Sequence, residues 1–217
     1  MELSRNRIIL IATVSAIGKI LSRKVQFFTI SRFSFAANIG WGLLISLQPP
    51  FYPQEAEKRG ATPSQYGFVF GIASFAAFIF SPIFGKYGAQ MGVNLVYNSG
   101  AFIQAFCGVA FGLLIYLDSL TAFLSLSYFL RFLDGVADAA SNCCGTSLLI
   151  KLFPDKAMSI FSWLETLFAF GYMMGPFIGS ALYQLGGFLL PFLVIGIWCL
   201  FGAFGKLFSF QKITECI

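Results

Sequence analysis

The chain has 217 residues, of which 58% are hydrophobic, 18% are aromatic and 11% are charged, and its mean hydropathy is +0.80. A soluble domain has about 25% charged residues, so this chain has too little charge to cover a water-exposed surface. These values exclude a soluble enzyme, a disordered chain and a secreted disulfide scaffold. They favour an all-α membrane protein, and because one span needs about 20 residues, six spans fit the length and twelve do not.

The residue types that are missing narrow the function further. The chain has no histidine, and its five cysteines form no CxxC pair, so we expect no metal site and no Ser-His-Asp triad. No phosphate loop or Rossmann glycine fingerprint is present either. We therefore expect neither an enzyme nor a bound cofactor. The net charge of +5 comes from residues scattered among apolar runs, which indicates a membrane protein rather than a nucleic-acid binder.

Residues 1–24 form a short basic segment. Its apolar part, residues 8–17, is too short to span a membrane, and no A-x-A cleavage pattern follows it. We expect this segment to lie in the cytosol or at the membrane interface.

Residues 25–208 are expected to form a bundle of six membrane-spanning helices. The first apolar segment, 33–52, ends in a proline-rich stretch and is followed by a polar loop at 54–60. Thr62 and Pro63 then predict a helix N-cap and first position, which begins the second segment, 65–84. The other segments are 95–117, 120–149, 158–182 and 188–208, with turns expected at 85–94, 118–119, 152–155 and 184–187.

The distribution of basic residues predicts the orientation of the bundle. With a cytosolic N-terminus, ten basic residues lie on the cytosolic side, whereas only Lys58 and Arg59 lie on the opposite side. This bias agrees with the positive-inside rule and with both termini in the cytosol. Residues 209–217 would form a short cytosolic tail, which we interpret as a probable truncation. The ten residues are Arg5, Arg7, Lys19, Arg23, Lys24, Lys86, Lys151, Lys156, Lys206 and Lys212.

Four charged residues fall inside the fourth and fifth apolar segments. Arg131, Asp134 and Asp138 lie within about 60° of one another on a helix that turns about 100° per residue, and Glu165 lies in the next segment. Charges in hydrocarbon are costly, so we expect them to face a cavity or a partner helix, as in a cation or proton pathway. A packing network is the alternative, and Arg131 with Asp134 has the i, i+3 spacing of a self-neutralising pair. Asp138 and Glu165 outnumber the single basic residue, Arg131, and so leave surplus negative charge in the membrane. This surplus favours a functional role for them.

Glycines recur every four residues in the fifth segment, at Gly171, Gly175 and Gly179. This spacing makes a flat stripe that allows helices to approach closely, and it is common in membrane helices of every function. Pro176 is expected to kink or loosen the same helix.

Four stretches together point to one family. They are residues 50–60 (PFYPQEAEKRG), the loop 85–92 (GKYGAQMG), the R-x-x-x-G-x-x-x-A pattern at 131–139, and GYMMGPFIG at 171–179. In this order and spacing, the chain resembles the N-terminal half of a major facilitator superfamily transporter. It is most similar to the vesicular amine transporter branch, especially its polyamine-transporter-like members. The motif residues in the loop and helices are Gly85, Lys86, Gly92, Gly135, Gly171, Gly175, Pro176 and Gly179.

The chain departs from the family pattern at two places. Ala89 and Gln90 stand where the superfamily loop carries Asp and Arg, so Lys86 would serve only in part for that charge relay. Ala37 and Asn38 stand where monoamine carriers have an acidic residue, which argues against a monoamine carrier.

The resemblance implies a six-helix half of the superfamily fold and alternating access around a midplane site. It implies exchange of a small organic cation, such as a polyamine, for protons in secretory or synaptic-type vesicles. Glu165, Asp138, Asp134 and Arg131 are then the candidate substrate and proton pathway. Because six spans make half of a carrier wall, we expect a second copy or a second six-helix half as partner, besides the lipid bilayer. The alternative is a non-transporting truncated protein that dimerises or associates with a full-length transporter.

Overall fold

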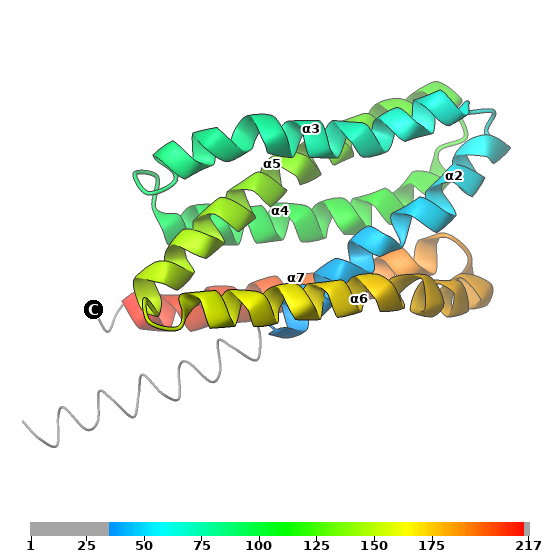
Figure 1. The fold of residues 1–217 in the computed structure, drawn as a ribbon. Helices are drawn as coiled ribbons and strands as arrows, with labels where there is room; N and C mark the ends of the chain where they lie inside the picture. The colour runs from blue at the N-terminus through cyan, green and yellow to red at the C-terminus, as the bar shows by residue number, and fades with distance from the viewer. Residues whose placement is uncertain (1–34, 215–217) are drawn as a thin grey trace, which may run out of the picture.

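A computed structural model of the chain describes residues 35–214, which are helical apart from short turns (Figure 1). The basic N-terminal segment expected at 1–24, and the start of the first span, lie outside these residues. A helical stretch at 35–46 leads into α2. The elements that follow are α2 (Gln48–Lys58), α3 (Pro63–Tyr87), α4 (Val93–Leu113), the 3-10 turn η1 (Leu114–Tyr116), α5 (Leu120–Leu152), α6 (Ala157–Gly186) and α7 (Leu189–Thr214).

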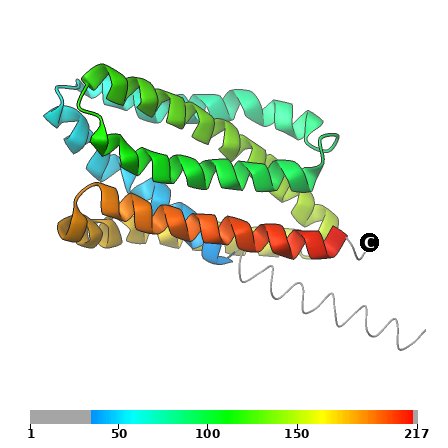
Figure 2. The same ribbon diagram turned by 180° about the vertical axis from the view of Figure 1, so that it is seen from behind.

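The helices pack side by side as one bundle. In Figures 1 and 2, α3, α4 and α5 lie together on one side, and α6 and α7 lie together on the other. Helix α5 packs against α3 and α4, α4 also packs against α7, and α7 packs against α6. The helical stretch 35–46 and α2, together called the first helix, run between the two groups. The indole nitrogen of Trp198 on α7 donates a hydrogen bond to the carbonyl of Ala36 at 3.2 Å, and Leu44 lies against Gly108 of α4.

The first helix is longer than its prolines suggested. The expected loop at 54–60 is instead helical up to Lys58, because Pro49 and Pro50 occupy the first turn of α2, where a missing N–H leaves no hydrogen bond unmade. Pro53 lies inside the same helix. The predicted start of α3 is confirmed: Thr62 is its N-cap, and its backbone N–H donates to Oε1 of Gln65 at 2.8 Å.

Two other boundaries differ from the sequence expectation. The turn between α3 and α4 covers only residues 88–92, so Gly85 and Lys86 belong to the last turns of α3 rather than to a loop. Helix α7 continues to Thr214, well into the expected tail at 209–217. Helix α6 remains helical on both sides of Pro176, where a kink or loosening was expected.

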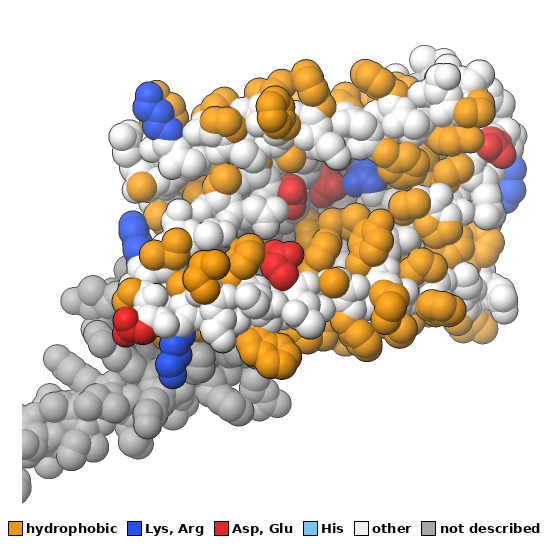
Figure 3. Space-filling view, in the orientation of Figure 1, with side chains coloured by type: hydrophobic (Ala, Val, Ile, Leu, Met, Phe, Trp, Pro, Cys, Tyr) orange, Lys and Arg blue, Asp and Glu red, His pale blue; other side chains and the backbone are white. Residues whose placement is uncertain are grey.

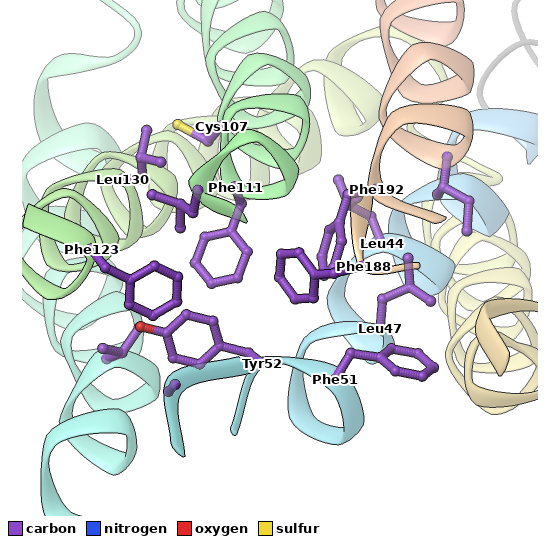
Figure 4. Close-up of a cluster of buried hydrophobic side chains, with 14 of the residues drawn as sticks. Leu44, Leu47, Phe51, Tyr52, Cys107, Phe111, Phe123, Leu130, Phe188 and Phe192 are labelled. Atoms are coloured by element: carbon purple, nitrogen blue, oxygen red, sulfur yellow. The ribbon is translucent and has the colours of Figure 1, made fainter. Parts of the chain in front are cut away.

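Aromatic side chains form a buried cluster between the helices (Figure 4). Tyr52 of α2 is fully buried. Its ring stacks on Phe123 of α5, with centroids 5.4 Å apart, and lies 5.0 Å from Phe111 of α4. Phe111 in turn lies 5.7 Å from Phe192 of α7. One cluster therefore joins four helices at the end of the bundle nearer α2.

The outer surface of the bundle is strongly apolar. Large side chains such as Phe68, Phe75 and Phe78 of α3 are more than 60% exposed. Of the described helices, three stretches are long and apolar enough to cross a membrane, namely Pro63–Tyr87, Val93–Tyr116 and Leu120–Lys151. This surface suits lipid or another apolar partner, as the composition predicted.

Candidate functional site

A buried ion pair lies in the middle of α5. Nη1 of Arg131 donates to Oδ2 of Asp134 at 2.8 Å, and the side chains are 7% and 17% exposed. The Arg131 guanidinium also faces two rings, 5.2 Å from Phe111 and 5.8 Å from Phe70, where the ring faces attract a cation. The local pair expected from the i, i+3 spacing is thus present, and it holds Arg131 in place.

Asp138, one turn further along α5, has neutral partners. Its Oδ1 accepts hydrogen bonds from Nε2 of Gln104 on α4 at 3.1 Å and from Nδ2 of Asn142 at 2.9 Å. Among the described residues it has no basic partner within ion-pair distance. Both of these hydrogen bonds therefore fall on one oxygen of the carboxylate.

Glu165 lies on α6 and is exposed. No salt bridge joins it to the basic side chains in the described part of the chain. The structure therefore brings Arg131 and Asp134 together, places Asp138 beside them on the same helix, and leaves Glu165 without a direct contact to that group.

One face of the bundle is partly polar. In Figure 3, acidic and basic side chains lie together in a recess in the middle of this face, and other charged side chains lie toward the two ends of the bundle. A small pocket beside the ion pair is lined by Trp41, Gln48, Phe111, Arg131 and Asp134, among others. The buried ion pair thus borders a small, partly polar space next to α2, α4 and α5.

The motif glycines are points of close helix contact. A methyl group on Gly171 would collide with the backbone of Ile39, and one on Gly175 would collide with the side chain of Ser46. Gly179 lies in the same way against Leu47. The glycine stripe of α6 is thus packed against the first helix within this chain, and is not an open surface for a second copy.

The remaining motif residues have different surroundings. A methyl group on Gly135 of α5 would collide with the backbone of Ala73, so α3 and α5 touch there. Gly92 has a φ of +90° directly before α4, which favours glycine. Gly85 has open space around it, and Lys86 has its amine 5.2 Å from the ring of Tyr87.

Sequence reasoning missed a polar network at the α2 end of the bundle. Arg59 donates to the carbonyls of Ile115 and Leu117 at 2.9 and 3.0 Å, and to Oε2 of Glu55 at 3.1 Å. Oε1 of Glu55 accepts from Tyr183 of α6 at 3.2 Å. Burial alone would raise the pKa of Glu55, but the hydrogen bonds from Lys58, Arg59 and Tyr183 outweigh it and lower the pKa below its ordinary value.

Gln104 and Gln48 were also missed as site residues. Both are buried, at 4% exposure. The signal that could have identified them in the sequence is an amide side chain within an otherwise apolar segment.

Comparison with known proteins gives a consistent result. The family profile described as Major Facilitator Superfamily matches residues 31–212. The chain is 33% identical over 176 residues to the human MFS-type transporter SLC18B1, which covers 81% of this chain and 38% of that protein. It is 32% identical to the multi-drug resistance efflux pump PmrA of Streptococcus pneumoniae (76% and 41%) and 28% identical to the synaptic vesicular amine transporter of Mus musculus (75% and 31%). The chain spans less than half the length of these relatives.

Proposed function

Because the chain belongs to the Major Facilitator Superfamily, we propose that it takes part in membrane transport of small organic cations in exchange for protons. Its similarity to SLC18B1 and to vesicular amine transporters is consistent with the vesicular amine branch. The superfamily consists of transporters, and we propose no catalytic reaction for this chain. We further propose six membrane crossings with both termini in the cytosol, and a vesicle membrane as the location.

The observation that carries this proposal is surplus negative charge within apolar helices. Arg131 neutralises Asp134, so Asp138 and Glu165 are two further carboxylates with no basic partner among the described residues. An ionised carboxylate in such surroundings is costly unless a cation or a proton accompanies it. A carboxylate that binds either a proton or an ammonium group, but not both tightly, couples the movement of one to the movement of the other.

Ala37 and Asn38 stand where monoamine carriers have an acidic residue, so the carboxylates of α5 and α6 are the proposed cation site. A polyamine has several ammonium groups, which suits carboxylates carried by two different helices. Because six helices form half of a carrier, we propose that transport requires a second copy or a second six-helix half. A non-transporting chain that associates with a full-length carrier is the competing proposal.

The test is uptake of a labelled polyamine into proteoliposomes with an acidic interior. The chain is reconstituted alone and together with the C-terminal half of a relative. Proton-driven uptake should require Glu165, so Glu165→Gln should abolish it. Glu57→Gln is the matched control, since Glu57 is exposed and its carboxylate accepts a hydrogen bond from Tyr66 at 2.9 Å. Uptake at the wild-type rate in Glu165→Gln would refute the assignment. The competing proposal is tested by cross-linking the chain to a full-length relative in a separate reconstitution. Cross-linking there, together with no uptake in the first two reconstitutions, would favour the competing proposal.

A further inference from the structure

A small cavity lies beside the buried ion pair, between α2 with the preceding helical stretch, α4 and α5. Its volume is about 10 Å³, which is close to the smallest space that holds one water molecule. Its wall includes Trp41, Gln48, Cys107, Phe111, Arg131 and Asp134. The cavity matches the size of one water molecule and is far too small for an organic cation.

Two of the residues that line the cavity each have a buried polar atom without a protein partner. Oε1 of Gln48 and Nε of Arg131 are both buried, and neither has a hydrogen-bond partner in the described part of the chain. The two residues are only 4% and 6% exposed. The amide oxygen is an acceptor and the guanidinium N–H is a donor, and leaving either unpaired in an apolar interior is unfavourable.

We propose that one water molecule binds in this cavity, where it donates a hydrogen bond to Oε1 of Gln48 and accepts one from Nε of Arg131. An ammonium ion would not serve, because it has no acceptor for Arg131 and adds a second positive charge. An anion would have no proton for Gln48 and would lie close to Asp134. Water supplies both a donor and an acceptor, and two polar partners are enough to hold it.

The bound water connects the first helix to the charged group on α5. Gln48 is the first residue of α2, and the water links it to Arg131, which is itself paired with Asp134. The ion pair is thus hydrated although aromatic rings surround it. This site goes beyond the proposed transport function and does not depend on it.

X-ray radiolysis of bound water tests the site, because hydroxyl radicals formed from a buried water oxidise the side chains next to it. Cys107 lies on the cavity wall and is 3% exposed, whereas Cys144 is 2% exposed and packs against Val96 and Ala140, away from the cavity. In the purified chain, mass spectrometry should find that Cys107 is oxidised several-fold faster than Cys144. Equal rates for the two cysteines would overturn the proposal.

Gln48→Met removes the amide and keeps a side chain of similar length. With one polar partner left, the water should be lost, and the oxidation rate of Cys107 should fall to that of Cys144. Continued protection of Cys144 reports that the variant is folded. An unchanged Cys107 rate in a variant with protected Cys144 would also overturn the proposal, and if the variant does not fold, the wild-type comparison decides by itself. Transport is not measured, so failure here is distinct from failure of the proposed function.

Discussion

Replacing Asp134 with asparagine should destabilise the bundle by about 3 kcal/mol, because it leaves the Arg131 cation buried without its counter-ion. In the wild type the two charged atoms are 2.8 Å apart and the Arg131 side chain is 7% exposed. Unit charges about 4 Å apart attract each other by about 4 kcal/mol at an effective dielectric constant of about 20. The rings of Phe111 and Phe70 still face the guanidinium in the variant, which holds the loss near the lower end of the about 3–5 kcal/mol usual for such a change.

Asp138→Asn is the matched control, because it makes the same chemical change one turn further along the same helix. The amide oxygen of the new side chain still accepts from Gln104 and Asn142, whose hydrogen bonds Asp138 now receives. No buried cation is left unpaired, so the expected loss is below about 1 kcal/mol.

The measurement is the free energy of unfolding in mixed micelles, from a titration with a denaturing detergent followed by the fluorescence of the three tryptophans. Equal losses in Asp134→Asn and Asp138→Asn would refute the reasoning. The double variant Arg131→Met with Asp134→Leu should lose less stability than Asp134→Asn, since it buries neither charge.

Two further predictions concern packing and pH. Gly171→Ala should lower the same free energy of unfolding by about 1–3 kcal/mol, because the new methyl group meets the backbone of Ile39. Gly67→Ala, in a helix with open space around that position, should leave it unchanged or raise it, and equal losses at the two positions would contradict the packing argument. Since the folded-state pKa of Glu55 is lowered, its contribution to stability is present above its unfolded-state pKa and is lost as pH falls through the lower, folded-state pKa. Wild-type stability followed from neutral to acidic pH should therefore fall more steeply than that of Glu55→Gln, and parallel curves would contradict this assignment.

Much of the fold follows from local sequence. Long apolar segments separated by polar or glycine-containing turns predicted the long helices α3 to α7, because hydropathy and capping act over neighbouring residues. Thr62 was identified as an N-cap and Ser119 as part of a turn, and both lie directly before helices. The Arg131–Asp134 pair could be predicted for the same reason, since a spacing of three residues brings side chains together on any helix.

The prolines of the first helix were misread as the end of the helix, although proline fits the first turn of α2. Prolines at the start of α2 were expected to end the first helix, yet the chain remains helical to Lys58. Arg59, just past the end of α2, donates hydrogen bonds to Glu55 and to the carbonyls of Ile115 and Leu117. The two carbonyls belong to residues more than fifty positions further along the chain. Those two contacts fix the side chain that follows α2, and no local rule reports them because their partners are distant in sequence.

The chemistry of the site divides in the same way. Composition and periodicity located the charges of α5 and α6, because an ionisable residue in an apolar segment is visible without a structure. Only the tertiary structure supplied Gln104 as the partner of Asp138, buried the glycine stripe of α6 against the first helix, and set Gln48 beside Arg131 on one cavity wall. Those relations join residues far apart in the chain, and they depend on how whole helices pack rather than on which residues are neighbours in sequence.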